Sequence, residues 1–215
     1  MEDLKRLFDQ NRKLVADITK TDAEFFKKRA GKQEPDFLFI GCADSRVPIE
    51  TLTGVTPGEM FVHRNIANQV HSVDLNLLSV LQYAIEVLDV KHVIVCGHYE
   101  CGGVKAAMGD RSYGLVDHWL AGIRDTCSRH EQELQGISDA NRRFRRAVDL
   151  NVLQQVHNLA RTPIVQTAWK RGRRPILHGL VYDLHDGLLR DLALQIDGND
   201  RVAELLEMTR RPVGD

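Results

Sequence analysis

Four short, continuous apolar runs constrain the fold of this 215-residue chain more than any other feature. Each run ends in polar or glycine-bearing residues, and stretches with apolar residues at helical spacing lie between the runs. Strands that are apolar on both faces are typical of parallel sheets covered by helices on each side. The runs occupy residues 37–40, 60–62, 92–96 and 176–181, and an alternating run at 192–196 predicts an edge strand.

The segments before and between the runs predict helices. Residues 4–29 have the pattern of one or two polar amphipathic helices, and Pro35 ends that pattern. Further helices are expected over 75–88, 115–134 and 139–160. The alternation predicts an α/β fold: a mainly parallel β-sheet flanked by helices, with an antiparallel edge strand and extended N-terminal helices. We expect one domain over 1–215, with a helical arm at 1–34, an α/β core at 35–197 and a C-terminal helix or tail at 198–215.

Composition narrows the class of protein. The chain is 43% hydrophobic, which suffices for one sizeable core, and its formal net charge is −1. No run approaches the ~18 apolar residues that span a bilayer, and the polar start has no signal-peptide pattern. The sequence therefore predicts a soluble, cytoplasmic protein that binds neither nucleic acid nor membranes through its overall charge. Four cysteines are too few for a disulfide scaffold, so they are better candidates for metal binding or catalysis.

The residues best suited to metal binding or catalysis follow two of the predicted strands. Cys42, Asp44 and Arg46 follow the first run, and His98 and Cys101 follow the third. Because function in open parallel sheets concentrates beyond the carboxyl ends of strands, these side chains are expected at one rim. Two thiolates, an imidazole and a carboxylate suit four-coordinate zinc better than magnesium or calcium. A Zn²⁺ site is therefore predicted, while Cys96 and Cys127 are expected to be packing residues.

Several segments together resemble the β-class carbonic anhydrases. Residues 42–48 and 97–103 resemble the two signatures of that family, 61–68 resembles a third block, and 178–183 resembles the late strand and turn. The similarity covers roughly residues 30–195, and the chain resembles the bacterial, bicarbonate-regulated subgroup, but with Phe39 at its tryptophan position.

The resemblance implies an activity and a catalytic centre. It implies a lyase, carbonate dehydratase, that reversibly hydrates carbon dioxide to bicarbonate and a proton by zinc-hydroxide attack. Cys42, His98 and Cys101 would hold the Zn²⁺ ion, with Asp44 as the fourth ligand in a closed form. Asp44 and Arg46 would form the catalytic pair. One carboxylate between a metal and an arginine predicts a pH-dependent switch, and two thiolate ligands predict higher activity at alkaline pH.

The resemblance also implies sites for small molecules and for partner subunits. The substrates would be carbon dioxide, water and bicarbonate, with a homodimer or homotetramer placing some pocket residues across an interface. The implied substrate pocket comprises Gln33, Phe61, Ile66, Tyr83 and Gly102. A regulatory bicarbonate pocket would use Arg64 and Tyr182, but Phe39 stands where regulated members have tryptophan. Phe39 has no indole N–H, so the pocket loses a hydrogen bond to the anion of about 1.5–3 kcal/mol.

Two other functions remain open at this point. The same centre would serve hydrolysis of carbon disulfide or carbonyl sulfide, and a direct assay with each gas separates these activities. A structural zinc protein or a nucleic-acid binder would instead use the basic runs at 142–146 and 170–174. The net charge of −1 and the lack of paired Cys-x-x-Cys units argue against that class. A zinc deaminase is excluded because no Pro-Cys-x-x-Cys segment occurs in the chain.

Overall fold

The structure is a computed structural model that describes residues 2–172, 174–192 and 195–208. The chain divides into two compact units, residues 1–34 and residues 35–215. In the described part, no helix has the length and apolar character needed to cross a bilayer.

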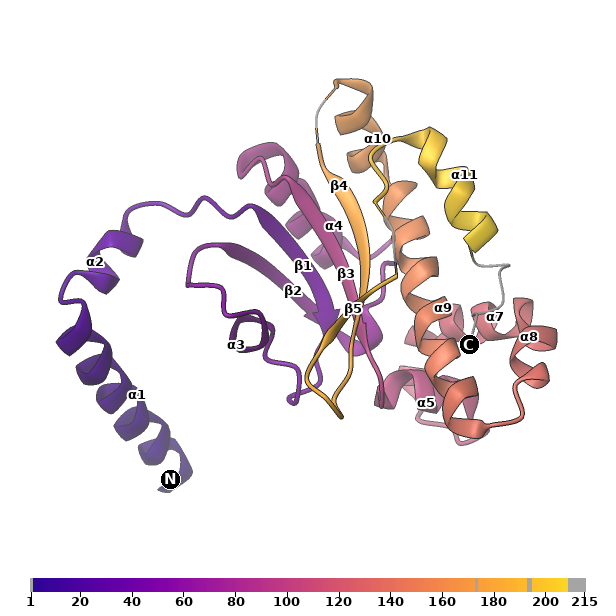
Figure 1. Cartoon of the computed structure of the whole chain (residues 1–215), viewed down its shortest axis with the longest axis horizontal. Helices are drawn as coiled ribbons and strands as arrows, with labels where there is room; N and C mark the ends of the chain where they lie inside the picture. Colours follow the sequence, from indigo (N-terminus) through magenta and orange to yellow (C-terminus); the bar gives the residue numbers. More distant parts are fainter. Residues whose placement is uncertain (1, 173, 193–194, 209–215) are drawn as a thin grey trace. The chain divides into compact units, whose positions relative to one another are not determined.

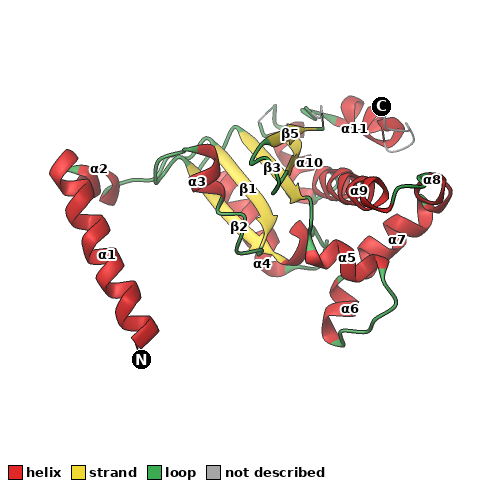
Figure 2. Ribbon diagram, turned by 60° about the horizontal axis from the view of Figure 1, so that its bottom comes forward, coloured by secondary structure: helices red, strands yellow, loops and turns green. Residues whose placement is uncertain are grey.

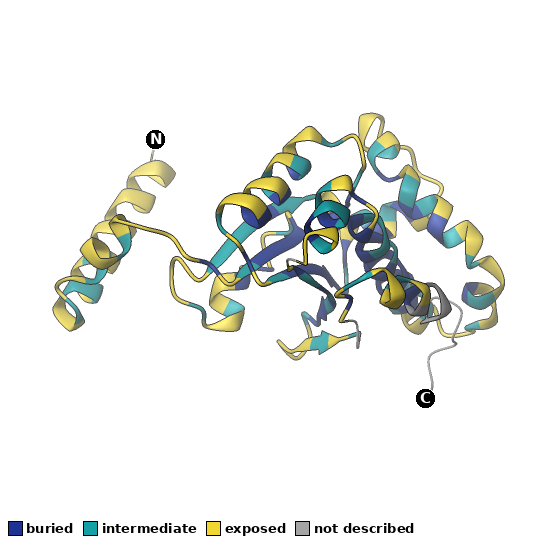
Figure 3. Ribbon diagram, turned by 90° about the horizontal axis from the view of Figure 1, so that it is seen from above, coloured by how far each residue is buried: buried dark blue, intermediate teal, exposed yellow. Residues whose placement is uncertain are grey.

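The N-terminal unit consists of two helices, α1 (Glu2–Thr21) and α2 (Phe25–Ala30). Neither helix buries a residue, and Figure 3 shows α1 exposed along most of its length. Leu7, Phe8 and Leu14 on α1 are each more than half exposed. An amphipathic helix derives most of its stability from packing of its apolar face, so this unit presents an apolar face without a cover in the single chain.

The second unit is built on a sheet with the strand order β2–β1–β3–β4–β5 (Figures 1 and 2). The first four strands run parallel, and β5 pairs antiparallel with β4. The predicted fold class is therefore confirmed. The strand bounds are β1 Phe37–Cys42, β2 Met60–Asn65, β3 His92–His98, β4 Ile176–Tyr182 and β5 Leu189–Asp191.

Alternate residues of the central strands enter two different cores. Leu38 and Ile40 face a large core that includes Val152, whereas Phe39 and Ile94 face a smaller core. Successive side chains of a strand point to opposite faces, so a continuous apolar run fills both cores at once.

Helix α9 (Ala140–Ala160) is the main element on the large-core side and packs along β3 and β4 (Figure 1). Asp139 begins it by accepting a hydrogen bond from the Arg142 N–H at 2.7 Å. A Cβ atom on Gly97 of β3 would lie 2.6 Å from Val152 Cγ2, so this close approach of helix and strand requires glycine. The other helices of this unit are α3 Ile49–Thr53, η1 Ile66–Asn68, α4 Leu75–Gln82, η2 Tyr83–Val87, α5 Gly102–Met108, α6 Leu115–Trp119, α7 Ala121–Arg129, α8 Glu131–Gly136, α10 Pro163–Lys170 and α11 Asn199–Met208.

The edge strand and two helices differ from the sequence prediction. The antiparallel strand is 189–191 rather than 192–196; beyond it, Ile196 forms only an isolated bridge with Leu177, and residues 193–194 lie outside the described residues. The segment 75–88 is an α-helix followed by the π-helix η2, and 115–134 is divided among α6, α7 and α8. Of the predicted C-terminal tail, residues 209–215 also lie outside the described residues.

Candidate metal centre

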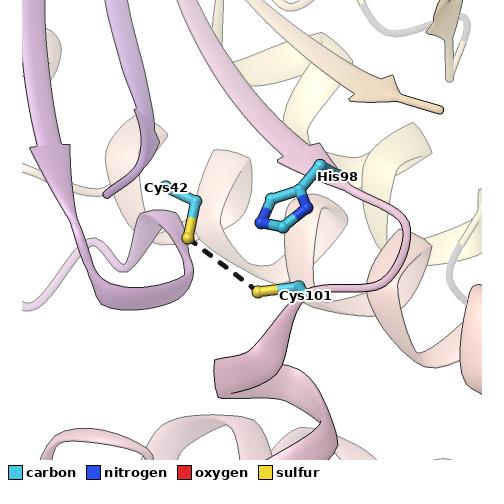
Figure 4. A group of neighbouring side chains, drawn as sticks. All are labelled: Cys42, His98 and Cys101. Carbon is cyan, nitrogen blue, oxygen red and sulfur yellow. Dashed lines mark hydrogen bonds between the residues drawn. The ribbon is translucent and has the colours of Figure 1, made fainter. Parts of the chain in front are cut away.

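The carboxyl ends of two adjacent strands bring the predicted ligands together. Cys42 is the last residue of β1 and His98 the last residue of β3, and these strands are parallel neighbours. Cys101 follows three residues after His98, as the N-terminal cap of α5. Figure 4 shows the three side chains converging from β1, β3 and the start of α5. All three are buried, with at most 5% exposure.

The three ligand atoms lie within 4.8 Å of one another, and the two sulfur atoms are 4.0 Å apart. Among the described residues, Cys42, His98 and Cys101 are the only such group of three. Two sulfurs and one nitrogen at this spacing fit the first shell of a tetrahedral zinc ion and leave a fourth position open. The structure therefore brings the two strand ends together, as the sequence predicted.

The imidazole of His98 is oriented for metal binding. Its Nδ1 lies 2.9 Å from the Tyr99 carbonyl oxygen, so Nδ1 carries the hydrogen and donates it. Its Nε2 is buried and has no hydrogen-bond partner. A buried nitrogen lone pair without a partner costs free energy unless a ligand occupies it. This orphaned atom, beside two sulfurs, fits a resident zinc ion.

The two thiols ionise unequally. The Cys101 thiol beside Cys42, together with His98 and the Ala67 N–H, lowers the pKa of Cys42 to about 4. The neighbouring Cys42 sulfur and burial raise the pKa of Cys101. Ionisation of one thiol therefore opposes ionisation of its neighbour, and a bound cation would favour the thiolate form of both. By contrast, burial raises the pKa of Cys96 to about 12, consistent with its predicted role in packing.

Asp44 is held by Arg46 through a two-pronged contact. Arg46 Nε donates to Asp44 Oδ1 at 3.0 Å, and Arg46 Nη2 donates to Oδ2 at 2.7 Å. The Arg46 guanidinium lowers the pKa of Asp44 to about 2. Asp44 Oδ2 also lies 3.7 Å from His98 Nε2, so the carboxylate faces the ligand cluster. Arg46 is itself positioned by the Glu100 carbonyl oxygen, which accepts a hydrogen bond at 3.1 Å.

A strained loop supplies one contact that the sequence did not predict. The backbone N–H of Ala67 donates to Cys42 Sγ at 3.4 Å, and both Ala67 and Asn68 have a positive φ, 60° and 49°. Two buried amide side chains hold this loop: Gln69 Nε2 and Asn151 Nδ2 donate to the Ala67 carbonyl oxygen at 2.8 and 3.1 Å. Every residue except proline has a backbone N–H, so the sequence cannot show which one will contact Cys42. The amide side chains Asn151 and Gln155, within the otherwise apolar pattern of α9, were the only hint of a buried polar network.

The predicted substrate residues are only partly brought together. The rings of Phe61 and Tyr83 lie 5.9 Å apart, and Ile66 lies beside α5, where a Cβ on Gly103 would approach its Cγ2 at 3.1 Å. Around Gly102 a Cβ would meet nothing within 4 Å. Gln33 belongs to the N-terminal unit, so the second unit by itself does not contain it.

The three residues of the predicted regulatory pocket lie on β1, β2 and β4. Phe39 and Tyr182 are buried in the smaller core. Arg64 donates to the carbonyl oxygens of Cys42 and Asp44, at 2.8 and 2.6 Å. The guanidinium therefore secures the backbone that follows β1.

Comparison with known proteins decides the family. The family model described as carbonic anhydrase matches residues 37–189. A structure of the Coccomyxa β-carbonic anhydrase in complex with acetazolamide is 39% identical, with a TM-score of 0.90, and covers 95% of this chain and 92% of that one. This chain belongs to the β-carbonic anhydrase family.

Relatives that are described as carbonic anhydrases come from fungi and from a bacterium. A carbonic anhydrase from Emericella nidulans is 47% identical over 90% of this chain and 85% of its own length. A structure of a tetrameric β-carbonic anhydrase from Sordaria macrospora is 36% identical, with a TM-score of 0.85, and covers 90% of this chain and 98% of that one. A carbonic anhydrase from Pseudomonas aeruginosa is 36% identical over 77% of this chain and 76% of its own length. The comparisons support the β class, whereas the bacterial subgroup stays a prediction because fungal proteins are among the strongest matches.

This β-carbonic anhydrase catalyses the reversible hydration of carbon dioxide and uses zinc as its cofactor.

Proposed function

We propose that Cys42, His98 and Cys101 are the protein ligands of the catalytic zinc and that Asp44 and Arg46 form the catalytic pair. The observation that carries this proposal is the buried, unpartnered Nε2 of His98 beside two sulfur atoms. Zinc held there acts as a Lewis acid and lowers the pKa of a bound water toward ~7.

Asp44 orients the attacking water in this proposal. Its carboxylate is ionised because Arg46 holds it, so it accepts a hydrogen bond from the water and fixes the direction of the oxygen lone pair. The proton on the oxygen therefore points to Asp44, and the lone pair is free to attack the carbon of carbon dioxide. The substrate carbon needs an apolar site next to this oxygen, and Phe61, Ile66, Tyr83 and Gly102 are proposed to supply it.

The metal assignment is tested by Cys101→Ala with Cys127→Ala as the matched control. Cys101→Ala removes one thiolate, so zinc content measured by elemental analysis and carbon dioxide hydration are both expected to fall to near background. Cys127 lies on α7 and is not part of the group of three ligand atoms, so its alanine variant should retain both. Full zinc occupancy in Cys101→Ala would contradict the assignment.

We also propose that Asp44 leaves Arg46 and binds zinc in a closed, inactive state. Arg46 keeps the pKa of Asp44 near 2, so Asp44 is ionised in both states and the switch follows the state of the water, not of the carboxyl. At low pH a water held by zinc would stay un-ionised, and the Asp44 carboxylate would then compete with it for the metal. Hydration rates should therefore rise steeply between pH 6 and 9; a flat profile would remove the switch and leave the metal ligands unaffected.

A weakened bicarbonate pocket at Phe39, Arg64 and Tyr182 is retained as a proposal. Its support is the position of Arg64, which donates to the carbonyl oxygens of Cys42 and Asp44. An anion that drew Arg64 away would loosen the backbone of both residues. Phe39 supplies no N–H to such an anion, so we expect weak inhibition by bicarbonate.

We propose that the chain assembles as a homodimer or homotetramer. The support is an apolar patch formed by Val73, Leu115, Val116 and Trp119, which lines a cavity of about 550 Å³. Val73 is 87% and Leu115 84% exposed. Exposed apolar patches of this kind mark protein interfaces, and the Sordaria macrospora relative is tetrameric.

The cytoplasmic location is likewise a proposal. Its support is that all four cysteines are free, as expected in a reducing compartment. A relative from Arabidopsis thaliana, 33% identical over 82% of this chain and 63% of its own length, is mitochondrial, so the family occurs in more than one compartment.

A further inference from the structure

A short turn, formed by Tyr99 and Glu100, joins His98 at the end of β3 to Cys101 at the start of α5 (Figure 4). Its two backbone carbonyl oxygens contact different parts of the candidate centre. The Tyr99 oxygen accepts from His98 Nδ1 at 2.9 Å, and the Glu100 oxygen accepts from Arg46 Nη2 at 3.1 Å. The same turn therefore orients the imidazole of a proposed zinc ligand and the arginine of the proposed catalytic pair.

The backbone of this turn is strained. Glu100 has a φ of 62°, in the left-handed region that residues with a Cβ atom seldom adopt. The Tyr99 N–H donates to the Tyr182 carbonyl oxygen at 2.9 Å, which continues the pairing of β3 with β4 by one hydrogen bond. The Tyr99 and Glu100 carbonyl groups lie beyond the end of β3, so strand pairing does not set their direction. Their direction depends on the contacts that hold the turn.

The side chain of Tyr99 provides such a contact. It belongs to the large core, with 6% exposure, and its hydroxyl donates to Asp149 Oδ1 at 3.0 Å. Asp149 lies on α9, the helix that packs along β3 and β4. A buried hydrogen bond therefore ties the strained turn to the main helix on this side of the sheet.

The ring of Tyr99 is held as well as its hydroxyl. The guanidinium carbon of Arg145, from the basic run at 142–146, lies 3.5 Å from the centroid of this ring. Arg145 Nη2 donates to Asp183 Oδ2 at 2.9 Å, and Asp183 follows β4 and is 3% exposed. The tyrosine side chain is thus enclosed by residues of α9 and of the segment after β4.

We propose that Tyr99 is a positioning residue, whose buried side chain holds the strained turn so that its two carbonyl oxygens orient His98 and Arg46. Without the hydrogen bond to Asp149, Glu100 relaxes toward a negative φ, and both carbonyl groups rotate away from their donors. His98 then holds zinc less firmly, because the partner of its second nitrogen fixes both the tautomer and the direction of the ring. This inference rests on the proposed zinc centre.

Zinc transfer to a chelator, measured on the zinc-loaded protein, tests the role of the hydrogen bond. Tyr99→Phe removes the hydroxyl, and Asp149→Leu removes its acceptor; Asp149 lines a cavity of about 520 Å³, so the larger side chain has room. Both variants should release zinc about tenfold faster than wild type, the lower end of the effect typical for partners of metal-binding histidines. Asp149→Asn retains an oxygen that accepts from the hydroxyl, so its release rate should stay close to that of wild type. Wild-type release from Tyr99→Phe and Asp149→Leu would overturn the proposal.

Val165→Ala separates positioning from a general loss of stability. It truncates a fully buried side chain on α10, so thermal unfolding should show it less stable than wild type, with unchanged zinc release. The visible spectrum of the Co²⁺-loaded protein reports the ligand geometry directly, and it should change in Tyr99→Phe but not in Val165→Ala. If zinc release and spectrum instead follow stability in both variants, Tyr99 is a packing residue and the proposal fails.

A double-mutant cycle with Glu100→Gly tests whether Tyr99 acts through the turn. Glycine adopts a positive φ without strain, so the turn depends less on Tyr99 in that background. Tyr99→Phe should therefore accelerate zinc release by only about threefold in Glu100→Gly. A tenfold acceleration in both backgrounds would show that the strained turn is not what Tyr99 holds, and would overturn the proposal.

Carbon dioxide hydration at saturating zinc tests the second carbonyl group. Tyr99→Phe should lower kcat/KM about tenfold, because Arg46 loses a hydrogen bond of the charged type from the Glu100 oxygen. An unchanged kcat/KM would overturn the part of the proposal that concerns Arg46. A wild type that holds no zinc would contradict the proposed centre and this role of Tyr99 with it, whereas zinc-loaded wild type and unaltered variants would contradict the role of Tyr99 alone.

Discussion

At the scale of single residues, the proposed mechanism depends on how one carboxylate, that of Asp44, is held. Asp44 has both oxygens bonded by Arg46, and the Glu100 carbonyl oxygen fixes Arg46 in turn. A two-pronged contact sets direction as well as charge, which a lone ammonium group cannot do. Arg46 is therefore proposed to act on the water through Asp44 rather than by touching the substrate.

Replacing Arg46 tests this arrangement. Arg46→Ala is expected to lower kcat/KM for carbon dioxide about 10- to 100-fold, the loss of a charged hydrogen-bonded pair, with zinc content unchanged. Arg190→Ala, which removes ion pairs with Asp186 and Asp183 and none with Asp44, should keep the wild-type rate. A loss of zinc in Arg46→Ala would show that the arginine is structural.

The same variant changes acid stability in a defined direction. Arg46 depresses the pKa of Asp44 to about 2 from its ordinary 3.8, so the stability from this pair is present above pH 3.8 and is lost as pH falls through about 2. Removing Arg46 should abolish that contribution, so acid unfolding curves should show the variant less stable than wild type above pH 3.8, with the difference disappearing as pH falls through about 2.

The cluster of candidate ligand residues could be predicted from the sequence, whereas its main-chain partners could not. Cys42, His98 and Cys101 are chemically distinctive and follow strand ends, and parallel strands bring such ends together. The Ala67 N–H and the Glu100 carbonyl oxygen belong to groups that every residue possesses. Only the backbone path, which turns through positive φ at Ala67 and Glu100, directs them to the site.

At the scale of elements, helix α9 keeps the loop at Ala67 and Asn68 in its strained conformation. Asn151 and Gln155 form a buried amide cluster with Gln69: Gln69 Nε2 and Gln155 Nε2 donate to Asn151 Oδ1 at 2.8 and 3.0 Å. Gln155 Oε1 accepts from the Val70 N–H at 2.9 Å. The free energy of these hydrogen bonds offsets the backbone strain at Ala67 and Asn68. Such strain costs on the order of 1–3 kcal/mol per residue.

Asn151→Leu should release this loop. It leaves buried donors and acceptors unpaired, so we expect destabilisation of about 1–3 kcal/mol and weaker zinc retention, because the Ala67 N–H no longer supports Cys42. Denaturant unfolding and zinc transfer to a chelator measure the two effects. Asn141→Leu, at an exposed position of the same helix, should change neither. Loss of stability without faster zinc transfer would limit Asn151 to packing.

Element positions could be predicted better than element boundaries. The apolar periodicity in 75–88 indicated a helix, but periodicity does not reveal the change to π geometry that precedes Asp89, where φ is +54°. The alternating pattern at 192–196 indicated an edge strand, yet pairing with β4 is set by the turn after Tyr182 and begins at Leu189. A turn fixes hairpin register more strongly than the apolar pattern of a short strand does.

At the scale of the whole molecule, both compact units present apolar surface to solvent. Leu7 and Phe8 on α1 are 56% exposed, and the apolar patch adds Val73 and Leu115. Soluble monomers seldom leave such surface open. The resemblance to the family implied assembly, but the sequence did not reveal the apolar patch, because α6 follows a loop and its exposed face depends on how Trp119 packs.

Leu115→Asp should therefore shift the assembly toward smaller species. If a second copy covers the apolar patch, the variant has to bury a carboxylate, which costs several kcal/mol. Sedimentation velocity over a range of concentrations should show a larger species for wild type and a smaller one for Leu115→Asp. Ser128→Asp introduces the same charge at an exposed site on α7 and should sediment as wild type does. If wild type sediments as a monomer, or if Leu115→Asp sediments as wild type does, the apolar patch is not an interface. Self-association through an apolar surface depends on protein concentration and is weakened by a buried charge.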